Sequence, residues 1–336
     1  MKQPDEAAKA CRDRAQVAGD RVRSGGVRMR AKFIIVSMAL SCLLLNQWAQ
    51  ADLFNDGGVH NLTSGWYDEI VVDNPPPADP AFTTVNLNGA GAMFFDAFNL
   101  SRVTINGGGA GTFSIHDGSQ ATINSGGAGL LRTYNHSQMT VNDAMADYLR
   151  AYDVSKVTIN GGSFVPGVEF YDSSEGLIND GWANHFSAHD FSQLTINGGL
   201  AYDIIFADGQ SRVTMNGGCT EKLTAGGQSR VTLNGGDLFS IRAHDSAEMI
   251  VRGTEFAVYS FLDHDLLFSG YGELFDWSGR FWLSGRLADG NYYPGLELRI
   301  TQGSLVILAP VPLPGAALLG CIGLSCAGWR LRRRQT

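Results

Sequence analysis

One stripe of planar side chains is the feature of this sequence that best fits ligand contact. The stripe recurs at intervals of 18 or 19 residues as His116, Tyr134, Tyr152, Tyr171 and His189. If these positions lie on neighbouring strands about 4.8 Å apart, the rings form a continuous platform of the kind on which sugar rings stack. The alternative is a ladder that only stabilises the strands, by about 0.2–1 kcal/mol for each pair. We therefore predict a glycan-contact stripe, with the structural ladder as its alternative.

Catalytic chemistry has weaker support. Glycosidases need two carboxyl groups about 5–9.5 Å apart in one cleft, and a regular repeat without long insertions offers no such cleft. His-Asp pairs recur only because their column recurs, and His264-Asp265 is the one irregular pair. The sequence has no His/Cys cluster with zinc spacing and no glycine loop that opens a helix. We therefore predict no catalytic residues and no metal site. The recurring pairs are His116-Asp117, His189-Asp190 and His244-Asp245.

An Asx column follows the stripe by one residue and raises the question of calcium. Calcium takes six to eight oxygen ligands, whereas each turn here offers one side chain. The Asn-Gly-Gly turns also lack the Asp spacing of calcium-binding nonapeptide repeats. We predict turn formation and no cofactor, with weak divalent-cation binding as the alternative. The column is Asn99, Asp117, Asn135, Asp153, Asp172, Asp190, Asp208 and Asp245.

A repeat fixes the positions of all these residues. The octapeptide 101–108, Ser-Arg-Val-Thr-Ile-Asn-Gly-Gly, recurs with small changes at 155–162, 192–199, 211–218 and 229–236. A fixed short period indicates one structural unit stacked on itself. Its Asn residues are predicted to hydrogen-bond from one rung to the next. They stand at positions 88, 106, 124, 142, 160, 179, 197, 216 and 234, in steps of 18 or 19.

Each repeat holds two alternating segments. Val103 and Ile105 point one way and Thr104 the other, and Asn-Gly then ends the strand. In the second segment of one later repeat the predicted inward pair is Ile204 and Phe206, which puts Ala207 in the stripe column and Asp208 in the Asx column. Such alternation excludes a helical repeat.

The predicted fold is all-β: a single-domain parallel β-solenoid of about ten rungs. A right-handed β-helix is favoured, and a left-handed triangular helix is the alternative. We predict an N-terminal cap over 52–82, repeats over 83–262 and a C-terminal β cap over 263–310, because the ends of a solenoid expose strand edges that must be covered.

The N-terminal 51 residues are typical of an export signal. Basic residues precede an apolar run over 33–45, and Ala49 and Ala51 form an A-x-A cleavage site. The mature chain would begin at Asp52. One interpretation places the true start of the chain at Met29, and the alternative is a long basic N-terminal region that begins at Met1.

The C-terminal segment 311–336 is predicted to be a second targeting signal, in addition to the N-terminal export signal. Fifteen apolar residues over 315–329 predict a short transmembrane helix, below the ~20 residues that span a membrane comfortably. A simple tail anchor flanked by positive charge is one interpretation. The segment begins Val311, Pro312, Leu313, Pro314 and ends with Arg330, Arg332, Arg333 and Arg334.

The order Pro-x-Pro, short apolar helix and Arg cluster resembles the PEP-CTERM sorting signal of Gram-negative envelope proteins. Leu313 stands where that signal usually has Glu, as in a VPLP-type variant. The Ser-x-Val-Thr-Ile-Asn-Gly-Gly rungs and the Leu287-Ala-Asp-Gly290 ending resemble repeat-bearing members of the same group. The resemblance implies an exosortase-type processing enzyme, the inner membrane before processing, and a link to exopolysaccharide and biofilm.

Charge agrees with an exported rod. Residues 52–314 hold 12 Lys and Arg against 29 Asp and Glu, a net charge of −17. Such a surface disfavours nucleic acid as a partner. We therefore expect a non-enzymatic structural or adhesive protein of the cell envelope, cell surface or exopolysaccharide matrix, with extracellular polysaccharide as its partner. A polysaccharide lyase or glycoside hydrolase is the alternative, because parallel β-helices host both.

Overall fold

The computed structural model describes residues 51–74, 82–275 and 277–312. The predicted signal up to residue 50 and the sorting segment from Leu313 onward lie outside them. The described part of the chain is all-β and holds no helix, and therefore none long and apolar enough to cross a membrane.

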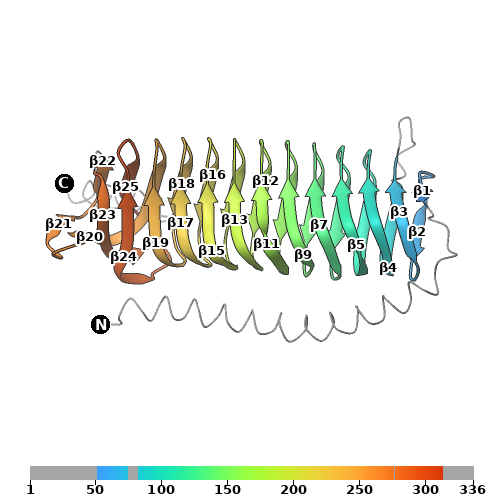
Figure 1. The fold of residues 1–336 in the computed structure, drawn as a ribbon, viewed down its shortest axis with the longest axis horizontal. Coiled ribbons are helices and arrows are strands. Elements are labelled where there is room, and N and C mark those ends of the chain that lie inside the picture. Colours follow the sequence, from blue (N-terminus) through green and yellow to red (C-terminus); the bar gives the residue numbers. More distant parts are fainter. Residues whose placement is uncertain (1–50, 75–81, 276, 313–336) are drawn as a thin grey trace, which may run out of the picture.

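The strands stack one after another into a parallel β-solenoid of about 11 turns (Figure 1). This confirms the predicted all-β solenoid. In Figure 1 the chain order follows the long axis, from β1–β3 at one end to β20–β25 at the other.

Two columns of strands make up the rod. The short-strand column contains β2 (Val59–Leu62), the first halves of β4 (Thr84–Ala97) and β5 (Arg102–Ile115), β6 (Gln120–Ile123), β8 (Gln138–Val141), β10 (Lys156–Ile159), β12 (Glu175–Ile178), β14 (Gln193–Ile196), β16 (Arg212–Met215), β18 (Arg230–Leu233), β20 (Glu248–Ser260) and β25 (Leu305–Pro310). The long-strand column contains β1 (Ala51–Phe54), β3 (Trp66–Val72), the second halves of β4 and β5, β7 (Gly127–Thr133), β9 (Met145–Ala151), β11 (Ser163–Phe170), β13 (Trp182–Ala188), β15 (Leu200–Ala207), β17 (Cys219–Ala225), β19 (Asp237–Ala243) and β24 (Tyr292–Ile300).

Alternation along each strand builds the core. In the first half of β5, Val103 and Ile105 are buried and Thr104 is half-buried. In the long-strand column the inward positions carry large side chains, and Phe113, Phe170 and Phe186 are almost completely buried. Because one inward face meets the other, the core runs continuously along the rod.

The two 19-residue steps are absorbed by irregularities in the long-strand column. The register shifts between Phe164 and Gly167 in β11, and between Ala201 and Ile204 in β15. The shift in β15 makes the predicted inward pair wrong.

Ile205 and Ala207 are the buried residues of β15, and the ring of Phe206 points outward to the ring of His189. Asp208 therefore stands in the stripe column, because its N–H donates to the carbonyl of Ala188 as the N–H of His189 does to that of Phe170. The assignments of Ala207 to the stripe column and of Asp208 to the Asx column were one residue off.

The two ends of the rod differ. Over 51–72, where the sequence predicts a cap, β1 and β3 join the long-strand column and β2 the short-strand column, all in parallel. At the other end β21 (Leu266–Ser269), β22 (Gly272–Phe275) and β23 (Gly279–Leu287) pair in antiparallel fashion with β20, β25 and β24. Strands β24 and β25 then return to the two columns.

Candidate binding surface on the long-strand column

The five residues of the predicted stripe lie side by side in one continuous stack. Phe98 begins it, and adjacent ring centroids are 4.6, 4.7, 5.0, 5.2 and 4.9 Å apart with interplanar angles of 4–13°. The rings therefore cover one another's faces and present their edges to the solvent. We call this set the ring stack: Phe98, His116, Tyr134, Tyr152, Tyr171 and His189.

The turn after each ring holds the stack at rung spacing. Asn135, Asp153, Asp172 and Asp190 all have positive φ values between 55° and 59°, a conformation that Asn and Asp tolerate best after glycine. The carboxylate of Asp153 accepts the N–H of Asn135 at 3.0 Å, and that of Asp172 accepts the N–H of Asp153 at 3.1 Å. These carboxylate oxygens therefore accept backbone hydrogen bonds that join one turn to the turn of the neighbouring rung. Among the described residues, no group of three or more His, Cys, Asp or Glu side chains could hold a metal ion.

A carboxylate hub lies beside the stack. Glu169, with 13% of its side chain exposed, accepts hydrogen bonds from Arg150 Nε at 2.7 Å and Tyr171 Oη at 2.9 Å, and lies 3.3 Å from His185 Nε2. Gly167 leaves room for this arrangement, since a Cβ atom there would lie 2.5 Å from the His185 ring.

The hub fixes two protonation states. The hydrogen bond with His185, together with those from Tyr171 and Arg150, lowers the pKa of Glu169 to about 2 against the opposing effect of burial. Burial and the neighbouring carboxylate raise the pKa of Tyr171 to about 12. At neutral pH Glu169 is therefore an anion and Tyr171 a neutral donor, so the pair suits positioning better than proton transfer.

An arginine next to the hub makes no ion pair with any described residue. Arg132 is the register neighbour of Arg150 on the adjacent rung. Whereas Arg150 pairs with Glu169 and covers the ring of Tyr148 at 4.4 Å, Arg132 makes no ion pair within the described residues, and its Nε atom is buried without a hydrogen bond.

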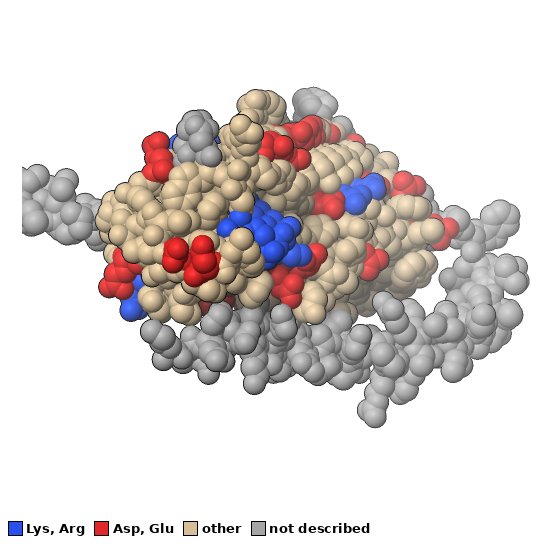
Figure 2. All heavy atoms as spheres, turned by 60° about the vertical axis from the view of Figure 1, so that its left-hand side comes forward, with Lys and Arg blue, Asp and Glu red and all other residues tan. Residues whose placement is uncertain are grey.

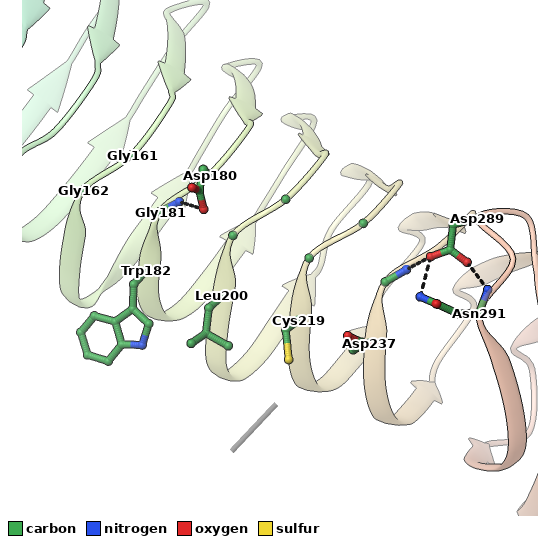
Figure 3. A pocket seen from close by; sticks show the side chains of 15 residues that line it. Gly161, Gly162, Asp180, Gly181, Trp182, Leu200, Cys219, Asp237, Asp289 and Asn291 are labelled. Atoms are coloured by element: carbon green, nitrogen blue, oxygen red, sulfur yellow. Dashed lines mark hydrogen bonds between the residues drawn. The ribbon is translucent and has the colours of Figure 1, made fainter. Parts of the chain in front are cut away.

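A second region is a groove of about 640 Å³ along the Asn-Gly-Gly turns (Figure 3). Glycine pairs form its floor because the turns leave no space for side chains: a Cβ atom on Gly198 would lie 2.4 Å from the carbonyl oxygen of Asn179. Trp182 lines its wall, and Asp289, which accepts the N–H of Gly236 at 2.8 Å, closes one end. We call it the glycine groove.

Sequence reasoning missed the hub, Arg132 and the glycine groove. Arg132, Arg150 and Glu169 each stand two residues before a ring of the stack, so extending the period of two back along the same strand would have found them. The His-Asp pairs stay on separate rungs; His244 contacts Asp245 at 2.7 Å, and His116 lies 3.8 Å from Asp96.

Charged side chains are unevenly distributed on the visible face in Figure 2. Acidic groups are scattered over it, whereas Lys and Arg gather mainly in one larger group.

The chain matches no family model, no curated protein and no solved structure.

Proposed function

We propose that this chain is an exported, non-enzymatic rod with a structural or adhesive role in the cell envelope or in an extracellular polysaccharide matrix. The unbroken asparagine ladder is the observation that carries the proposal. Eight hydrogen bonds of 2.7–2.9 Å join Nδ2 of each Asn to Oδ1 of the preceding one, from Asn88 to Asn234. No loop interrupts the ladder, which suits a rigid spacer.

Contact with polysaccharide is assigned to the ring stack. Five consecutive rungs, from His116 to His189, each present a hydroxyl or an imidazole group, and a linear glycan likewise presents its polar groups at regular intervals. Because the ring faces cover one another, this contact uses ring edges and polar atoms instead of stacking on an open face.

Export and anchoring rest on the two ends of the sequence. The cleavage site at Ala49 and Ala51 supports secretion, and the segment 311–336 supports sorting by an exosortase-type enzyme from the inner membrane.

The alternative function is cleavage of a polysaccharide as a lyase or glycoside hydrolase. One observation favours it: Asp180, Asp237 and Asp289 all line the glycine groove. Asp289 is already engaged, because it accepts hydrogen bonds from Gly236 and from the side chain of Asn291.

A polysaccharide panel distinguishes the two functions. The purified chain is incubated with neutral and acidic polymers, and both retention and new reducing or unsaturated ends are measured. We expect retention without new ends. New ends that vanish in an Asp180→Asn variant would establish the enzymatic alternative.

A further inference from the structure

We propose that Arg132 and Arg150, with the hydroxyls of Tyr134 and Tyr152, bind the anionic groups of an acidic polysaccharide. The inference rests on the proposed glycan contact at the ring stack and narrows it to one class of polymer.

Local charge on this surface favours an anionic ligand. On the outer face of the long-strand column, Ser114, Arg132, Arg150 and Glu169 follow one another in register. Glu169 offsets the charge of Arg150, whereas Arg132 makes no ion pair with any described residue. One positive charge is thus left over on a rod whose residues 52–314 carry −17.

The hydrogen-bonding capacity of these side chains also favours an anionic ligand. Within the described residues, the hydroxyls of Tyr134 and Tyr152 make no hydrogen bond, and the guanidinium of Arg132 makes no ion pair. Guanidinium groups offer only donors, and they bind carboxylates and other oxyanions in a fork geometry. Because these arginines and tyrosines together offer many hydrogen-bond donors, a ligand that binds them must offer many acceptors.

The packing of the ring stack also limits which sugars can bind there. Its faces are covered at centroid distances of 4.7 and 5.0 Å on either side of Tyr134. An uncharged sugar that relies on stacking therefore finds no open face there, whereas a chain with carboxylate or sulfate groups can use the donors at the ring edges. Glu169 holds the Arg150 guanidinium in place beside them.

The chain supplies a closely matched control on its other face. Arg212 neighbours Arg230 in register, and Arg230 is paired with Glu248 at 2.6 Å, just as Arg150 is paired with Glu169. Arg212 also makes no ion pair within the described residues, but it has no ring stack beside it.

The test measures affinity of the mature chain for polygalacturonate, dextran sulfate and carboxyl-reduced polygalacturonate. We expect Arg132→Gln to weaken binding to the first two polymers about tenfold or more, and Arg212→Gln to change it less than twofold. The reduced polymer should bind poorly, and affinity should fall with salt. Circular dichroism and thermal unfolding of both variants verify that they are folded.

Three results would overturn the inference in different ways. An equal loss in Arg132→Gln and Arg212→Gln would show diffuse charge attraction without a site. Undiminished binding of the reduced polymer would refute anion recognition but leave the proposed glycan contact standing. Binding to none of the three polymers, nor to a neutral panel, would refute both.

Discussion

The two turns of each rung join neighbouring rungs through different side-chain interactions. At the Asn-Gly-Gly turn, the Nδ2 group of each Asn donates a hydrogen bond to the Asn of the preceding rung. Its Oδ1 atom accepts a hydrogen bond from the Asn of the following rung. At the opposite turn, rings contact face to face and Asx side chains cap backbone N–H groups. Both arrangements hold the rungs together.

The two turns differ in how many side-chain hydrogen-bonding groups remain without a partner among the described residues. The Asn ladder pairs donor with acceptor in one repeating pattern through every rung from Asn88 to Asn234. The ring stack ends after His189, where Asp208 and Gly226 follow in its column, and its Tyr134 and Tyr152 hydroxyls remain unused within the described residues. We infer that the ladder is scaffold and that recognition belongs to the ring side.

The largest predicted effect tests the rigidity of the Asn-Gly-Gly turn. Gly108 has a φ of +85°, and a Cβ atom there would lie 1.9 Å from the carbonyl oxygen of Ala90. Gly108→Ala should therefore lower the free energy of unfolding by about 3 kcal/mol or more, or prevent folding. Gly107→Ala is the control, because its Cβ atom would meet nothing within 4 Å. Similar denaturation midpoints for the two variants would contradict this account of the turn.

The second prediction concerns acid stability on the ring side. The pKa of Glu169 is lowered from 4.5 to about 2, so the carboxylate stabilises the fold above pH about 4.5. That contribution should be lost as the pH falls from about 4.5 to about 2, and should amount to about 2 kcal/mol after allowance for partial exposure. Glu169→Gln should remove it, as measured by urea unfolding at several pH values. A variant with the same pH slope as the wild type would show that the hub contributes nothing.

The third prediction is a graded loss along the Asn ladder. Asn160 makes two ladder bonds, whereas Asn234, at its end, makes one. Asn160→Ala should cost about 1–2 kcal/mol and Asn234→Ala about half of that, because each exposed bond contributes modestly. Unfolding free energies measured side by side decide this. If the end position is as sensitive as the middle one, hydrogen-bond count is not the cause.

The smallest predicted effect separates two tyrosines of the ring stack. Tyr171 donates to Glu169 at 2.9 Å, and Tyr152 makes no such bond within the described residues. Tyr171→Phe should cost about 1 kcal/mol and Tyr152→Phe close to nothing, since both variants keep the rings. A thermal unfolding series would show the difference, and an equal cost would mean that ring packing alone governs both sites.

The sequence predicted the regular parts of this molecule well. A period of 18 residues with alternating Val and Ile defines which strands stack, and the confirmed Asn ladder follows from that register. It could not place the extra residue of a 19-residue rung. Ile204 and Ile205 are equally apolar, so alternation alone allowed either to face inward, and the bulge in β15 buries Ile205.

The candidate site was predictable only in position. Spacing brings Tyr134 beside Tyr152, but it does not tell whether their rings face the solvent or each other. Rung alignment places Glu169 beside Arg150, 19 residues away, but it does not predict their hydrogen bond. Such contacts depend on rotamers and on the space that Gly167 leaves, and neither is visible in a repeat pattern.

Hydroxyl-radical footprinting with and without polygalacturonate compares the two regions most directly, because it reports the solvent access of aromatic side chains. We predict that the polymer protects Tyr134 and Tyr152 on the ring side and leaves Trp182 in the glycine groove unchanged. Protection of Trp182 with no change at the two tyrosines would contradict it and would move recognition to the groove.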